Sequence, residues 1–313
     1  MHCIHVDNNR NLDIDADGEA LILREQGHKT GSLPLGSVER IFLHGETRIQ
    51  ARALAKIGAA GIGLIVMRGI QHEPTLFLPR AHHDATSRLR QCHAHLTHRL
   101  QEARLLLANK WQSQVTVLER ALKHHPAQRL AIHGALHKLQ SHRTSLDAQG
   151  SLNALLGWEG ACAEIYYRAL AAQLPAWTGF VKRNRRPPKD PANALMSLCY
   201  TLAHAEAVLS AHRHGLDPDI GMLHAIEFGR ESLACDLMEP LRALIDEWLV
   251  NTLQDGQFSA ADFTQEGQAC LLGKAARSHL YTQWESQRPH WRSLLDSHCA
   301  EAVARWKAYP CAT

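Results

Sequence analysis

The sequence predicts a two-domain α+β protein, with a small N-terminal β-rich domain followed by a larger all-α domain. The chain has 313 residues, which is more than one small domain usually needs. Hydrophobic residues make up 45% and charged residues 21%, so a sizeable core can be buried. The spacing of the apolar residues changes from strand-like to helix-like near His82, and this change predicts the order of the two domains.

The β-rich domain is expected over residues 1–82. Turn-forming residues in this region separate short apolar runs, which lie at residues 3–6, 20–23, 38–43, 62–67 and 75–78. Between the third and fourth runs, Ile49, Ala53, Leu54 and Ile57 have the spacing of one amphipathic helix that stops at Gly58. We therefore expect a small sheet-rich domain with a single helix.

The helical domain is expected over residues 96–313, after a histidine-rich linker at residues 83–95. Leu96, Leu100, Ala103 and Leu107 begin a long helical pattern. Further helices are predicted at residues 161–174, 192–212, 232–253 and 273–285. Proline and glycine residues interrupt these patterns, as expected for short connections between helices.

Charge and cysteine content exclude several classes of protein. The chain has 34 Lys and Arg against 31 Asp and Glu, a formal net charge of +3 that is too small to indicate a partner. The eight cysteines are scattered without a C-x-x-C pair, which argues against a zinc ribbon and a disulfide framework. No stretch approaches the roughly 18–20 apolar residues of a membrane span, and the N-terminus lacks a signal-peptide core. We expect a cytoplasmic protein that makes no contact with membranes.

Acidic and imidazole side chains at three places in the helical domain are candidates for a metal site. They are Glu159 in the segment LLGWEG, His224 in GMLH, and the pair Asp236 and Glu239 in LACDLMEP. A spacing of three places Asp236 and Glu239 on one face of a helix. Two carboxylates with an imidazole suit Mg²⁺ or Mn²⁺. Spacing alone also allows ordinary solvated or hydrogen-bonded polar groups.

A cluster of positive charge lies at residues 181–190, VKRNRRPPKD. Its basic residues are Lys182, Arg183, Arg185, Arg186 and Lys189. Such a loop suits contacts with the phosphate backbone of a nucleic acid, which position the nucleic acid without reading its sequence. The alternative is an ordinary solvated surface.

Two other chemistries fit the sequence less well. The histidine-rich stretch at residues 82–98 lacks the closed ligand spacing of a zinc site. Tyr166, Tyr167 and Tyr200 could be nucleophiles of a tyrosine recombinase, but they lie beside apolar helical stripes, where aromatic residues are more often part of the core.

Several blocks of the chain, in order, resemble the family of CRISPR-associated adaptation integrases. The three strongest are LLGWEGACAEIYYRAL (residues 155–170), RRPPKDPANALMSLCYTL (185–202) and GLDPDIGMLHAIEFGRESLACDLMEPLR (215–242). Weaker similarity extends to residues 32–69 and 263–285, so the resemblance covers most of the chain.

The resemblance implies roles for the acidic and histidine residues. Glu159, His224 and Glu239 match the family's catalytic metal ligands, with Asp236 as the neighbouring, secondary acid of the same motif. It also implies that the helical domain is catalytic, that the ion is Mg²⁺ or Mn²⁺, and that the β-rich domain serves dimerisation.

The implied function is that of a metal-dependent DNA endonuclease and integrase in antiviral adaptive immunity. Family members insert new spacer DNA into a CRISPR array by attack of a 3′-hydroxyl on a phosphodiester. They are homodimers that work with a small ferredoxin-like adaptation protein on double-stranded DNA, both protospacer and array. The alternative is a non-catalytic nucleic-acid-binding scaffold of the same adaptation complex.

Overall fold

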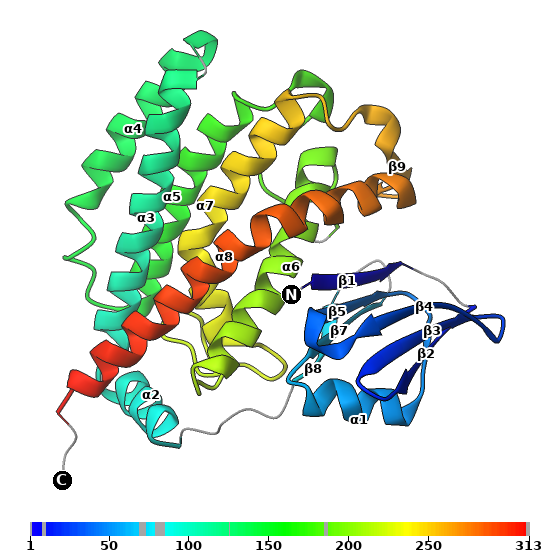
Figure 1. The fold of residues 1–313 in the computed structure, drawn as a ribbon. Helices are drawn as coiled ribbons and strands as arrows, with labels where there is room; N and C mark the ends of the chain where they lie inside the picture. Colours follow the sequence, from blue (N-terminus) through cyan, green and yellow to red (C-terminus); the bar gives the residue numbers. More distant parts are fainter. Residues whose placement is uncertain are drawn as a thin grey trace. The chain divides into compact units, whose positions relative to one another are not determined.

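The computed structural model describes residues 2–7, 11–68, 73–78, 85–124, 126–184 and 187–310 (Figure 1). The chain divides into two compact units. Unit 1 comprises Met1–Asp84 together with Leu280–Gln287, and unit 2 comprises Ala85–His279 and Arg288–Thr313. A β-rich N-terminal region is thus followed by a largely helical region, which confirms the predicted fold class.

In unit 1, the residues that the structure describes form two four-stranded sheets. The first has the order β1 (His2–Asp7), β5 (Val38–His44), β7 (Gly63–Arg68) and β8 (Glu73–Phe77), of which only β8 is antiparallel to its neighbour. The second has the order β4 (His28–Pro34), β3 (Ala20–Glu25), β2 (Leu12–Asp17) and β6 (Arg48–Ile49). The predicted single helix is α1 (Ala51–Ala59), and a short 3₁₀ turn, η1 (Leu35–Ser37), precedes β5.

The core of unit 1 explains its strand pattern. Ile41, Phe42 and Leu43 of β5 are consecutive and all buried, as are Leu64 and Ile65 of β7. Strands in the middle of a parallel sheet are covered on both faces, so they read as continuous apolar runs rather than as alternating ones. The apolar runs at 38–43 and 62–67 are therefore the central strands of the first sheet, whereas the runs at 3–6 and 75–78 fall in its edge strands and the run at 20–23 falls in the second sheet.

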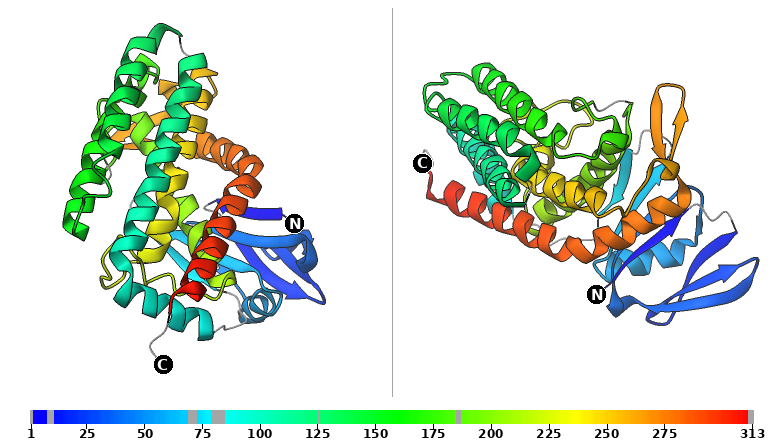
Figure 2. Two further views of the ribbon diagram at one scale, coloured as in Figure 1. Left: turned by 90° about the vertical axis from the view of Figure 1, so that its left-hand side faces the viewer. Right: turned by 90° about the horizontal axis from the view of Figure 1, so that it is seen from above.

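Within the described ranges, unit 2 is built around seven helices. They are α2 (Ala85–Thr97), α3 (Arg99–His124), α4 (Arg129–Arg143), α5 (Leu152–Ala171), α6 (Pro191–Arg213), α7 (Ser232–Gln254) and α8 (Lys274–Ala308). Three 3₁₀ turns, η2 (Pro126–Gln128), η3 (Ala176–Thr178) and η4 (Ala260–Asp262), and one hairpin, β9 (Phe263–Glu266) with β10 (Ala269–Leu272), complete the unit. Helix α7 packs against α3 and α6 in the middle of the unit (Figure 2).

Helix α6 is a largely buried helix of unit 2. The Asp190 side chain caps its N-terminus by accepting a hydrogen bond from the Asn193 backbone, and Pro191 occupies the first turn. Among the described residues, α6 alone is long and apolar enough to cross a membrane, but 83% of its apolar window is buried inside the protein. This burial is typical of a core helix in a soluble protein.

The boundaries differ from the expected ones in two places. Most of the expected linker at 83–95 is helical, because α2 begins at Ala85. Part of the C-terminal helix α8 belongs to unit 1, where the Tyr281 hydroxyl lies 3.0 Å from His44 Nδ1 and Glu285 Oε1 lies 3.0 Å from His5 Nε2. The division at residues 82 and 96 is therefore approximate.

Candidate active site

Three helices of unit 2 bring two of the predicted ligands to one point. Helix α5 carries Glu159 and α7 carries Glu239, and both helices pack against α3, although α5 and α7 are about 80 residues apart in sequence. The Lys110 ammonium on α3 donates hydrogen bonds to Glu159 Oε1 and to Glu239 Oε2, the second over 2.5 Å. The two carboxylates therefore face each other across a single cation.

Glu239 is held as an anion inside the protein. Burial by itself would raise the pKa of this carboxyl, but the guanidinium of Arg242 and the ammonium of Lys110 outweigh burial, with a smaller contribution from His224. Together they hold the pKa of Glu239 well below its usual range. Arg242 Nε donates to Glu239 Oε1 over 3.0 Å, and its guanidinium lies over the Tyr200 ring, 4.6 Å from the centroid.

His224 lies in the connection between α6 and α7, and Asp236 fixes its orientation. The buried Asp236 carboxylate accepts hydrogen bonds from the ring Nδ1 over 2.7 Å, from the backbone N–H of His224 and Leu223, and from that of Met222. With Nδ1 bound to a carboxylate, the other ring nitrogen, Nε2, is the one suited to bind an ion. Asp236 thus positions the ring of His224, a predicted ligand, and its own coordination of an ion also stays a prediction.

Gly221 is required for the backbone path of the connection between α6 and α7 that carries His224. A Cβ atom at this position would lie 2.7 Å from the backbone carbon of Ser232 and 2.9 Å from Asp236 Oδ2, so no larger residue fits without a shift. The glycine lets the backbone approach the first turn of α7, where Asp236 receives its hydrogen bonds.

Helix α2 and the start of α3 anchor the same connection. The Gln91 amide donates to the carbonyls of Asp217 and Ile220, each over 2.8 Å. His95 Nδ1 lies 2.7 Å from the carbonyl oxygen of Gly221, and Arg99 Nε donates to that of Met222 over 2.9 Å. The histidine-rich stretch therefore contains residues that hold the His224 backbone in place, a role the sequence did not predict.

The donor chemistry fits a divalent cation. Within the described ranges, no three acidic, histidine or cysteine side chains converge closely enough to hold an ion, and the group between Glu159 and Glu239 is the Lys110 ammonium. That ammonium shows that the two carboxylates together accept a cation. Two carboxylate ligands and a carboxylate-oriented imidazole are the donors that Mg²⁺ or Mn²⁺ takes in proteins. Metal coordination by Glu159, His224 and Glu239 stays a prediction.

Lys110 and Arg242 are site residues that sequence reasoning missed. Lys110 follows the buried Leu107 by three residues and precedes the buried Gln114 by four, so it lies on the buried stripe of α3. A lysine at such a position needs a buried counter-charge, which is the pattern that could have revealed it. Arg242 follows Glu239 by three residues, the spacing of a helical ion pair.

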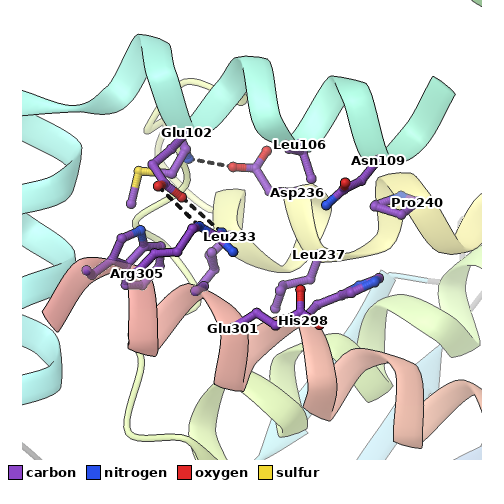
Figure 3. A pocket seen from close by; sticks show the side chains of 13 residues that line it. Glu102, Leu106, Asn109, Leu233, Asp236, Leu237, Pro240, His298, Glu301 and Arg305 are labelled. Carbon is purple, nitrogen blue, oxygen red and sulfur yellow. Dashed lines mark hydrogen bonds and ion pairs between the residues drawn. The ribbon is translucent and has the colours of Figure 1, made fainter. Parts of the chain in front are cut away.

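A small cavity of about 60 Å³ lies between α3, α7 and α8 (Figure 3). Asp236 and Pro240 line it from α7 and His298 from α8, while Glu102 is paired with Arg305 over 3.1 Å at one side. A cavity of this volume has room for a few waters.

The structure separates the basic residues of the 181–190 loop by their surroundings. Lys182 and Lys189 are exposed, whereas Arg183 is half-buried. Arg183 donates to the Asn193 side chain over 2.7 Å and to Ser197 Oγ over 3.1 Å. Its guanidinium stabilises the fold around α6. Arg185 and Arg186 lie outside the described residues.

The tyrosines considered as nucleophiles form a buried network. The hydroxyls of Tyr166 and Tyr200 donate to the Asp246 carboxylate over 3.2 and 2.5 Å, and the Tyr167 hydroxyl lies 3.2 Å from that of Tyr200. Burial raises the pKa of Tyr166 and Tyr200 well above the usual value, and the charge of Asp246 adds to this rise. A buried, protonated hydroxyl is a poor nucleophile, so these residues have a structural role.

Comparison with solved structures shows which known proteins share this fold. The chain superposes with a TM-score of 0.86 on a Cas1 protein from Thermotoga maritima, at 20% identity and over 100% of both chains. It also superposes on a casposase bound to integration product, with a TM-score of 0.83 at 18% identity, over 97% of this chain and 91% of that chain. The chain therefore has the fold of a Cas1 protein, which the casposase shares.

Comparison of sequences gives the family. The model of the family described as "CRISPR associated protein Cas1" matches residues 6–286. A CRISPR-associated endonuclease Cas1 from Thermodesulfovibrio yellowstonii is 32% identical over 300 residues, which cover 93% of this chain and 94% of that protein. A second, from Rhodospirillum rubrum, is 30% identical over 88% of this chain and 83% of that protein. The chain belongs to the Cas1 family of CRISPR-associated endonucleases.

Proposed function

We propose that the enzyme uses Mg²⁺ or Mn²⁺, held by Glu159, His224 and Glu239, to join protospacer DNA to a CRISPR array. The observation that carries this proposal is the pair of carboxylates that share the Lys110 ammonium, because a site that holds two acids around one cation is built for positive charge. The pKa of Glu239, well below its usual range, keeps that side chain anionic at any physiological pH.

The reaction is a phosphoryl transfer. The 3′-hydroxyl of the incoming DNA gives its proton to water as its oxygen forms a bond to phosphorus. The bond from phosphorus to the 3′-oxygen of the array strand breaks, and that oxygen takes up a proton. A bound divalent ion supplies Lewis-acid polarisation of the scissile phosphate and neutralises the charge of the displaced oxygen. Asp236 keeps the proton of the His224 ring on Nδ1, so that Nε2 is free to act as a ligand.

The same residues serve cleavage and joining. If water takes the place of the 3′-hydroxyl, the product is a cut strand instead of a joined one, and the site needs no additional group. No covalent intermediate with the protein is required, in agreement with the buried positions of Tyr166 and Tyr200.

We assign the exposed Lys182 and Lys189, together with Arg185 and Arg186, to contacts with DNA phosphates. Replacing Lys182 and Lys189 by alanine is expected to weaken binding to all DNA sequences. The slope of log affinity against log salt should flatten by about 0.9 for each phosphate of duplex DNA that the variant no longer neutralises. Lys123→Ala, at an exposed lysine of α3, is the charge-matched control. An unchanged slope in the double variant would mean that the two lysines are solvated surface.

We further propose that the enzyme is a cytoplasmic homodimer that joins through the β-rich unit and works with a small ferredoxin-like partner on double-stranded DNA. One structural neighbour supports the partner: 98% of this chain matches 35% of a chain from a Cas6-RT-Cas1–Cas2 complex, with a TM-score of 0.83. The partner proposed for this chain is a Cas2-type protein.

The test compares Glu159→Ala and His224→Ala with Glu164→Ala. Glu164 is an exposed acid on the same helix as Glu159, paired with Arg168, so its removal controls for charge. Both site variants should lose cleavage and strand transfer together and retain DNA binding and dimerisation. Glu164→Ala should behave as wild type. Joining at the wild-type rate by either site variant would refute the assignment of these residues. DNA binding without cleavage or joining by the wild-type protein itself would favour the scaffold function.

A further inference from the structure

We propose that Lys110 is a positioning residue that competes with the divalent cation for Glu159 and Glu239 and so sets the metal affinity of the site. This inference rests on the proposed function, because it takes these two carboxylates as metal ligands. It assigns to α3, which carries none of the predicted ligands, a part in controlling the metal.

The geometry places Lys110 directly against both ligands. Its ammonium contacts one oxygen of Glu159 and one of Glu239, and these side chains come from different helices. The side chain of Lys110 is 11% exposed and that of Glu239 only 5%. Water can therefore do little to weaken the attraction between them.

A metal ion and the ammonium need the same oxygens. Mg²⁺ and Mn²⁺ bind carboxylate oxygens at about 2.0–2.3 Å. An ammonium that stays in contact with the same oxygens would lie close to the ion, and the two positive charges would repel each other. The ion therefore has to displace the ammonium from at least one carboxylate. The measured affinity for metal is then the intrinsic affinity reduced by the cost of breaking buried ion pairs.

Removing the charge of Lys110 has opposite consequences in the two possible roles. If Lys110 competes with the ion, its removal leaves the buried carboxylate of Glu239 and the half-buried carboxylate of Glu159 without this counter-charge, and the ion binds more tightly. If Lys110 only holds α3, α5 and α7 together, its removal allows the carboxylates to separate, and the ion binds more weakly. Arg242 stays on Glu239 in both cases and does not affect the comparison.

The experiment is a titration of the whole chain with Mn²⁺ alone, in which free Mn²⁺ is measured by electron paramagnetic resonance at constant pH and salt. The variants are Lys110→Met and Lys110→Gln, with Lys123→Met as a control on an exposed lysine of the same helix and Glu159→Ala as a ligand control. We expect Lys110→Met to lower the Kd for Mn²⁺ by about tenfold or more, equivalent to about 1.4 kcal/mol. Lys110→Gln should also lower it, and Lys123→Met should leave it unchanged.

Thermal unfolding with and without Mn²⁺ gives a second measurement on the same proteins. Without the ion, Lys110→Gln should unfold at a lower temperature than wild type, because a buried counter-charge is missing. The rise in Tm on adding Mn²⁺ should be larger for Lys110→Gln than for wild type, since a ligand that binds the native state more tightly stabilises it more. A residue with only a structural role would not enlarge this rise.

The outcomes separate the inference from the proposed function. If wild type binds Mn²⁺, Glu159→Ala does not, and both Lys110 variants bind equally or more weakly, the inference is overturned and the proposed site stands. Should Lys110→Met prove unfolded, Lys110→Gln decides on the same criterion, and loss of folding in both variants counts against competition as the main role. If Mn²⁺ binding is undetectable in wild type but appears in a Lys110 variant, competition is supported. If neither wild type nor the variants bind Mn²⁺, both proposals are wrong.

Discussion

Replacing Asp236 by asparagine tests how the histidine ligand is held. The carboxylate accepts two hydrogen bonds on each oxygen: Oδ2 from the backbone N–H groups of Met222 and Leu223, and Oδ1 from the backbone and the ring Nδ1 of His224. Asparagine has the same shape but only one acceptor oxygen. Whichever way the amide turns, its NH₂ group faces two donors that then have no acceptor.

The hydrogen bonds predict the size of the effect. A hydrogen bond to a charged group contributes about 1.5–3 kcal/mol net, so losing two of them costs about 3–6 kcal/mol of folding free energy. Asp236 is buried, so solvent cannot replace the missing acceptor. For a unit of this size each kcal/mol shifts Tm by about 2–4 °C, and we therefore expect a decrease on the order of 10 °C.

The assay is thermal unfolding followed by circular dichroism, together with strand transfer measured at about 25 °C, where the variant is still folded. Asp147→Asn is the matched control, because Asp147 is an exposed acid paired with Arg143 on the neighbouring turn. Strand transfer by Asp236→Asn should fall sharply, since His224 loses its orientation. A Tm within about 2 °C of wild type, less than the shift for a single kcal/mol, and normal strand transfer would refute the role given to Asp236.

Two more predictions concern the surroundings of the site. Gly221→Ala should cost about 1–3 kcal/mol of stability and reduce activity, because its Cβ would overlap the Ser232 backbone. Gly157→Ala is the control and should not lower stability, because a Cβ at this position meets open space. Equal losses of stability in the two variants, measured by urea unfolding, would contradict the role given to Gly221. Burial raises the pKa of Asp246 to about 6, so the folded state binds a proton more tightly than the unfolded state, and stability should fall as pH rises from about 4 to 6. The decrease in the free energy of unfolding is at most about 3 kcal/mol. Asp246→Asn should flatten the pH profile of stability measured by urea unfolding. Parallel profiles for the variant and wild type would contradict this role of Asp246.

The sequence predicted which acids the fold brings together better than it predicted their surroundings. Glu159 and Glu239 stood out because acids interrupt apolar helical patterns there, and the structure brings them to one cation. Lys110 was missed because a lysine within a long amphipathic helix is normally taken as solvent-facing. Its position on the buried stripe becomes evident only when three helices from distant parts of the chain pack together, and this is a tertiary effect.

The difference at α2 has a similar origin. The buried face of this helix consists of Ser87, Gln91 and Ala94, which have helical spacing but no large apolar side chain. Gln91 is buried because its amide pairs with the backbone of the His224 connection, so the pattern of hydrophobicity could not predict the helix. The pattern of hydrophobicity also could not predict which strands pair, because β1 pairs with β5 and not with its neighbour in sequence.

Anomalous scattering from crystals soaked in Mn²⁺ tests the central claim most directly. We predict one strong peak in unit 2, bounded by the carboxylates of Glu159 and Glu239 and by the ring of His224, with Lys110 Nζ moved away from at least one carboxylate. A crystal that binds Mn²⁺ at another site while the Lys110 ammonium still bridges Glu159 and Glu239 would contradict the claim.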